Sequence, residues 1–170
     1  MPKNNAISKK QVVLPAITAA LVLTLAPTMA FAQNPHFIGR PNCDVDSQGN
    51  LDCSGRIAGL GNVEGVDANL VADVSATFGC DNPGRGIHIP PGQPTDAQEV
   101  EGDTETLPVR NGQARFSLSI DAPEPSEGFE CPNQNWDVVL VEVTYTNVRV
   151  EIDGDTLPIP GTFSEELIRV

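Results

Sequence analysis

The sequence contains no lysine after residue 10 and no acidic residue up to Ala32, so lysines and acidic residues lie in separate parts of the chain. Lys3, Lys9 and Lys10 precede the apolar stretch Val12–Met29, and Ala30-Phe31-Ala32 follows it. A basic start, an apolar run and a small-residue cleavage site are typical of a secretory signal peptide. We therefore predict that residues 1–32 are a signal peptide and that residues 33–170 form one exported domain, which is secreted or periplasmic.

The predicted exported part lacks a second apolar run long enough to cross a bilayer, so we expect no membrane insertion after the signal peptide is cleaved. Its basic residues are seven arginines against 23 acidic residues, which gives a formal net charge of −16. A protein with so negative a net charge repels nucleic acid and anionic lipid headgroups. The remaining partner classes are an extracellular or envelope protein and a glycan.

Catalytic signatures are also lacking: the sequence has no G-x-S-x-G, H-E-x-x-H, Walker or dinucleotide-binding motif. It has two histidines, His36 and His88, and His88 lies in a segment rich in glycine and proline. The closely spaced pairs Glu99 with Glu101 and Asp153 with Asp155 are expected in so acidic a chain and indicate surface charge. We expect a protein that is not an enzyme and needs no cofactor, with a secreted hydrolase as a weaker alternative.

Four cysteines in an exported chain predict two disulfides, for which three pairings exist. Folding residues 43–53 as a hairpin about Gln48 places Cys43 opposite Cys53, within disulfide range, with Gly49 at the left-handed turn position. This geometry favours the Cys43–Cys53 disulfide and leaves Cys80–Cys131 as the second.

The same hairpin gathers acidic side chains on one face. Asp44, Asp46 and Asp52 have the spacing of the front of a calcium loop, with Gly49 at its sixth position. However, Gly55 stands where such a loop needs a bidentate glutamate. We therefore expect a solvated hairpin face, with a calcium-dependent binding module using these three aspartates as the alternative.

Hydrophobic alternation elsewhere predicts strands, and no segment has convincing helical periodicity. The expected strands are 70–78, 113–120, 136–145, 148–152 and 162–170. About seven antiparallel strands with frequent turns predict an all-β, two-sheet sandwich of immunoglobulin-like architecture. Trp136 is expected in or near the core with Val138 and Leu140.

Two proline-rich segments, 81–96 and 122–135, are predicted to be loops. The Cys80–Cys131 disulfide would hold both at one end of the sandwich, where loops on a rigid frame commonly bind partners. We therefore expect a structural or interaction module with Arg85, Ile87 and Ile89 on its binding face.

A set of short motifs gives the chain a resemblance to a known group. They are Gly59-Leu60-Gly61-Asn62, Cys80-Asp81-Asn82-Pro83-Gly84 followed by Pro90-Pro91-Gly92, and Cys131-Pro132-Asn133 followed by Trp136. On these residues the region from about Cys43 to Ile152 resembles uncharacterised exported bacterial β-sandwich proteins. The resemblance implies a small disulfide-bonded β-sandwich and no particular activity.

Overall fold

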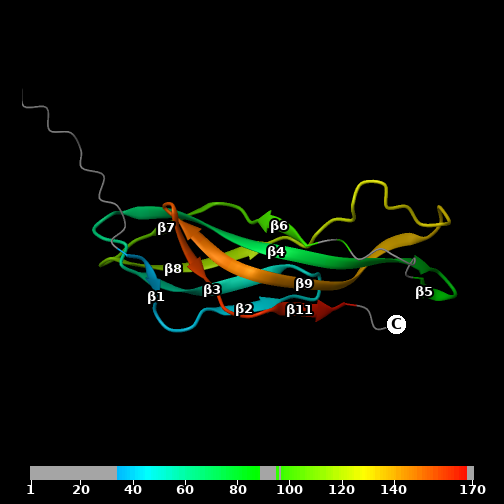
Figure 1. The fold of residues 1–170 in the computed structure, drawn as a ribbon, viewed down its shortest axis with the longest axis horizontal. Coiled ribbons are helices and arrows are strands. Elements are labelled where there is room, and N and C mark those ends of the chain that lie inside the picture. The colour runs from blue at the N-terminus through cyan, green and yellow to red at the C-terminus, as the bar shows by residue number, and fades with distance from the viewer. Residues whose placement is uncertain (1–33, 89–94, 96, 168–170) are drawn as a thin grey trace, which may run out of the picture.

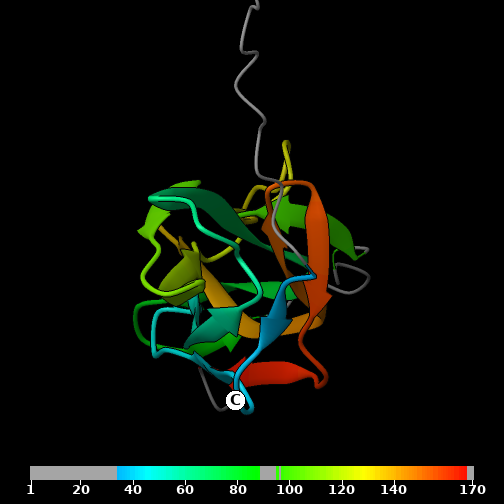
Figure 2. The ribbon, with the colours of Figure 1, turned by 90° about the vertical axis from the view of Figure 1, so that its left-hand side faces the viewer.

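The computed structural model describes residues 34–88, 95 and 97–167; the predicted signal peptide lies outside them. These described residues contain eleven strands and no helix. The strands form two antiparallel sheets that face each other across a shared interior, as the end-on view in Figure 2 shows. The predicted all-β sandwich with two disulfides is therefore confirmed, with more strands than the seven or so expected.

The smaller sheet, sheet A, has four strands: β1 (His36–Phe37), β2 (Asn42–Val45), β3 (Leu51–Ala58) and β8 (Gln113–Ile120). β3 pairs with β8 over its whole length, from Leu51 opposite Ile120 to Ala58 opposite Gln113. β2 and β1 share the other edge of β3. Alternation along β8 buries Ala114, Phe116, Leu118 and Ile120, as the sequence predicts.

The larger sheet, sheet B, is built on two long neighbouring strands, β4 (Gly65–Asn82) and β9 (Asp137–Ile152). Short strands line their outer edges. β4 pairs with β5 (Gly86–His88), β6 (Gln98–Glu101) and β7 (Glu105–Pro108), and β9 pairs with β10 (Asp155–Pro158) and β11 (Phe163–Glu166). The two segments predicted at 136–145 and 148–152 are thus one continuous strand, while the short polar strands β6, β7 and β10 give little sequence signal.

The main core lies between the sheets. Tyr145, Leu51 and Ile57 are fully buried in it, together with aliphatic residues from both sheets. Phe116 packs where Gly55 leaves room, because a Cβ on Gly55 would lie 2.8 Å from Cε1 of that ring. The sides of the sandwich are closed where β11 contacts β2 and β7 contacts β8.

One predicted loop is wrong in part. Within segment 81–96, Asp81 and Asn82 end β4, and Gly86–His88 form β5, which folds back on β4. The amide of Arg85 donates to the carbonyl of Asn82 at 3.0 Å, which closes a tight turn. Gly84 and Gly86 both have positive φ, a conformation that glycine adopts readily. Residues 89–94 and 96 lie outside the described part.

The long strands continue past sheet A. The β3–β8 ladder ends at Leu51 and Ile120, whereas the β4–β9 ladder continues to Asp81 and Asp137. Figure 1 shows this extension as a projection that ends near β5. We call residues 78–88, which include β5, together with residues 137–141 the arm. Phe78 and Cys80 are buried in it but do not belong to the main core.

Candidate functional site

The arm is covered on one face by residues 122–135, which we call the tethered loop. The Cys80–Cys131 disulfide joins this loop to β4, with the two Cα atoms 5.7 Å apart. Phe129 of the loop packs on Phe78 of the arm, with ring centroids 6.1 Å apart. The predicted pairing is confirmed, and the disulfide and the aromatic contact together fix the tethered loop to the Cys80 and Phe78 side chains of β4.

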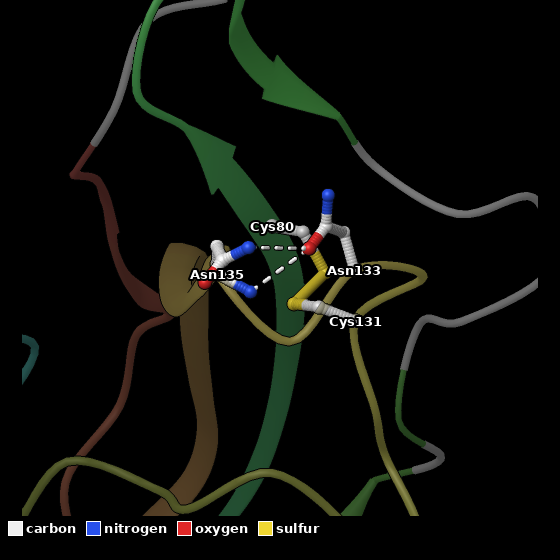
Figure 3. Close-up of a disulfide and its surroundings, with 4 residues drawn as sticks. All are labelled: Cys80, Cys131, Asn133 and Asn135. Atoms are coloured by element: carbon white, nitrogen blue, oxygen red, sulfur yellow. Dashed lines mark hydrogen bonds between the residues drawn. A yellow bond between two sulfur atoms is a disulfide. The ribbon is translucent and has the colours of Figure 1, made fainter.

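Local hydrogen bonds give the tethered loop a defined shape beside the disulfide. The side-chain oxygen of Asn133 accepts from the backbone and side-chain nitrogens of Asn135, at 3.0 and 3.2 Å (Figure 3). The amide of Trp136 donates to the carbonyl of Asn133 at 3.0 Å. An asparagine that bonds to the backbone two residues later forms a turn of its own. The loop therefore returns to the arm at Asp137, where β9 begins.

Val138 is the exposed apolar side chain of the arm, at 40%. It pairs with Cys80, and Leu140 pairs with Phe78, so both valine and leucine belong to the row that faces inward. Leu140 packs against the main core, but Val138 lies past the end of sheet A. The expectation that Val138 is a core residue is therefore wrong, and Trp136 beside it is half-buried.

The predicted binding face is only partly described. Arg85 is exposed in the turn between β4 and β5, and Ile87 is half-buried in β5, while Ile89 lies outside the described residues. Asp81 pairs with Ile87 on one side and with Asp137 on the other. The arm thus carries an acidic outer face, and the arginine and Val138 are its most distinctive exposed groups.

The acidic hairpin has the register that the sequence predicts. Cys43 lies opposite Cys53, their Cα atoms are 4.1 Å apart, and the disulfide is formed. Asp44 lies opposite Asp52, and both are exposed. Gly49 has a φ of 92°, in agreement with its predicted left-handed conformation.

The carboxylate of Asp46 is hydrogen-bonded within the turn of this hairpin. It accepts hydrogen bonds from the amide of Gln48 and from the amide and side chain of Asn50, at 2.8 to 2.9 Å. The side-chain bond from Asn50, followed by its backbone bond, lowers the pKa of Asp46. The described residues include no group of three or more His, Cys, Asp or Glu side chains placed to hold a metal ion. The three aspartates are therefore not brought together as one ligand set.

The hairpin turn is also anchored to the core. The hydroxyl of Tyr145 donates to the carbonyl of Gly49 at 2.7 Å, and the side-chain oxygen of Asn50 accepts from the amide of Ala122 at 2.8 Å. Burial, followed by the charges of Asp46 and Asp121, raises the pKa of Tyr145 to about 12. These contacts assign a structural role to the turn.

The residues considered for catalysis are dispersed over the fold. Glu99 forms an ion pair with Arg149 at 2.8 Å on the outer side of sheet B. Asp153 lies in the turn between β9 and β10, and Asp155 is the first residue of β10. His36 is exposed, with its Nδ1 3.0 Å from the carbonyl of Asn34, and the side chain of His88 lies outside the described part.

The contribution of Phe129 was not predicted from the sequence, although a signal for it exists. Phe78 precedes Cys80 by two residues, and Phe129 precedes Cys131 by two residues. In extended segments, residues two apart point to the same side. The repeated Phe-x-Cys pattern therefore indicates an aromatic contact beside the disulfide.

Comparisons with protein-family models, with curated proteins and with solved structures find no match to this chain. In the described part of the chain, no helix has the length and apolar character needed to cross a membrane.

Proposed function

We propose that this protein is an exported, non-enzymatic interaction module that binds a protein or glycan partner through its arm and tethered loop. Two disulfides fit an oxidising compartment, as expected for an exported protein. The basic, apolar and small-residue regions at the N-terminus support the same destination.

The observation that carries the proposal is the construction of the arm. A disulfide and an aromatic contact hold a proline-containing loop against Phe78 and Cys80, two buried residues of sheet B that lie outside the main core. This arrangement leaves Val138 at 40% exposure beside the fixed loop. A surface held in shape before binding loses less conformational freedom when a partner docks, which favours affinity.

The proposal is tested by capture experiments with the oxidised protein, using envelope and culture-medium fractions from its native source. Val138→Lys places a charge in the exposed apolar position of the arm, and Arg85→Ala removes the exposed cation of the β4–β5 turn. Both changes are expected to reduce recovery of a specific partner by tenfold or more, since buried anchor residues commonly contribute about 2 kcal/mol or more to binding.

A matched control is available at the opposite end of the long strands. Thr156 in β10 is exposed and pairs with Glu151, far along β9 from Asp137. Thr156→Lys introduces the same charge there and should leave capture unchanged. Equal capture by wild-type, Val138→Lys and Arg85→Ala would reject the arm as the binding surface, provided that all variants have the same melting temperature.

A further inference from the structure

A cluster of arginines lies at the opposite end of sheet A. Arg56 of β3 and Arg115 of β8 are directly paired across the two strands, and both are exposed on the outer face. Arg110 precedes β8 in the turn that Asn111 and Gly112 close, and its backbone bonds to Gln113 in both directions, at 2.8 and 3.1 Å. The three arginines, with Pro108, Gln113 and Ala114, line a hollow of about 390 Å³.

This cluster has no acidic counterpart. Among the residues that the structure describes, no Asp or Glu lines the hollow. In the described ranges, the ion pairs of the protein are made by Arg149 with Glu99 and Glu151, so none of the three clustered arginines is in an ion pair. The chain as a whole has 23 acidic residues and ten basic ones. The hollow is therefore lined by three positive charges that form no ion pair, on a molecule whose net charge is negative.

The pairing of two arginines across β3 and β8 destabilises this strand pair when no anion is bound. Arg56 and Arg115 lie directly opposite each other, and like charges at directly opposed positions of an antiparallel pair are destabilising. An anion held between the two guanidinium groups would convert that repulsion into attraction. The guanidinium group suits this task because its planar fork binds a carboxylate, sulfate or phosphate group through two parallel hydrogen bonds.

We propose that Arg56, Arg110 and Arg115 form a binding site for a small oxyanion that carries two or three negative charges. The volume of the hollow is near the lower end of the range for small-molecule sites, roughly 300–1,000 Å³, so the ligand is a small molecule. A long polyanion would meet the negative field of the remaining surface, which disfavours its approach. This site lies on sheet A, apart from the arm, and does not depend on the binding function proposed for the arm.

The site is tested by calorimetric titration of the purified, oxidised protein with citrate, sulfate and acetate at one ionic strength. We expect saturable binding of one ligand per chain, strongest for citrate, weaker for sulfate and weakest for acetate. Added sodium chloride should weaken it, because screening reduces attraction between exposed charges. Absence of saturable binding with both citrate and sulfate would overturn the proposal, and so would binding of heparin when citrate does not bind.

Variants separate specific recognition from a general effect of charge. Arg115→Gln should weaken citrate binding by about tenfold or more, since a hydrogen bond between charged groups is lost. Arg115→Lys keeps the charge but loses the planar fork, so it should fall between wild-type and Arg115→Gln. Arg85→Gln removes the same charge from the arm and is the matched control. Equal losses in Arg115→Gln and Arg85→Gln, or no loss in either, would show that the cluster is not the site.

Discussion

The hydrogen bond between Tyr145 and Gly49 offers a sharp test of how the acidic hairpin is fixed to the core. Tyr145 is fully buried, and its hydroxyl donates to the carbonyl of Gly49 at 2.7 Å. Tyr145→Phe removes the donor and leaves that buried carbonyl without it, while the ring is retained. A buried acceptor left unsatisfied costs about 1–3 kcal/mol, so we expect the free energy of unfolding at pH 7 to fall by that amount.

The same hydroxyl predicts a loss of stability at high pH. The folded-state pKa of Tyr145 is about 12, compared with about 10 in the unfolded chain. Below pH 10 both states keep the proton, so Tyr145 contributes no pH dependence there. Between about pH 10 and 12 the unfolded state loses the proton and the folded state keeps it. The free energy of unfolding should therefore fall by about 1.4 kcal/mol for each pH unit in this window.

The composition makes this measurement direct. The chain contains one tyrosine, and residues 33–170 contain no lysine that would titrate in the same range. The ultraviolet absorbance of the ionised phenol follows this single group in native protein and in urea. Urea unfolding at several pH values then gives the stability profile. Tyr145→Phe should be less stable than wild-type at pH 7, with a flatter profile above pH 10.

Two results would refute this reasoning. The first is a native titration midpoint equal to that in urea, which would mean that the hydroxyl is not buried. The second is a Tyr145→Phe variant as stable as wild-type at pH 7, which would mean that the carbonyl of Gly49 is satisfied without the tyrosine.

The disulfides and the acidic hairpin give two further predictions. Removing the Cys43–Cys53 disulfide, with a sequence separation of 10, should lower the free energy of unfolding by about 2.7 kcal/mol, and removing Cys80–Cys131, with a separation of 51, by about 4 kcal/mol. Urea unfolding of the two double Cys→Ser variants measures both losses. A larger loss for the shorter loop would contradict the loop-entropy argument. The melting temperatures in calcium and in EDTA should be the same, because the carboxylate of Asp46 already accepts hydrogen bonds from Gln48 and Asn50 in the turn. A melting temperature several degrees higher in calcium, with the increase abolished by Asp44→Asn, would instead support the calcium-dependent module.

The features that were predicted correctly depend on short stretches of sequence. Alternation around Gly49 sets the hairpin register, and the register sets the Cys43–Cys53 disulfide. The alternation of β8 is equally local, and the strand predicted at 113–120 is confirmed. Once the short disulfide is assigned, Cys80–Cys131 follows by elimination, so one local argument determined a contact between distant parts of the chain.

The features that were missed depend on where the two sheets end relative to each other. Val138 continues an inward-facing row, and its 40% exposure arises because sheet A stops at Leu51 and Ile120. A register shift in the β4–β9 ladder between Thr77 and Phe78 further changes which β9 residues face inward. The aspartates posed a similar problem, because their spacing is compatible with calcium binding and only the positions of the Asn50 donors show that Asp46 belongs to the turn.

The Cys80–Cys131 disulfide joins the arm to the tethered loop, beyond the end of sheet A and outside the main core. The arm gains little from the main core, and its outer face places Asp81 directly opposite Asp137, which is unfavourable for a strand pair. Hydrophobic burial there is confined to a few contacts such as Phe78 with Phe129, so the covalent bond supplies stability that packing does not. Reduction should therefore open the arm and the tethered loop before the rest of the sandwich. The binding surface proposed for the arm would then exist only in the oxidised protein, which links its formation to an oxidising compartment.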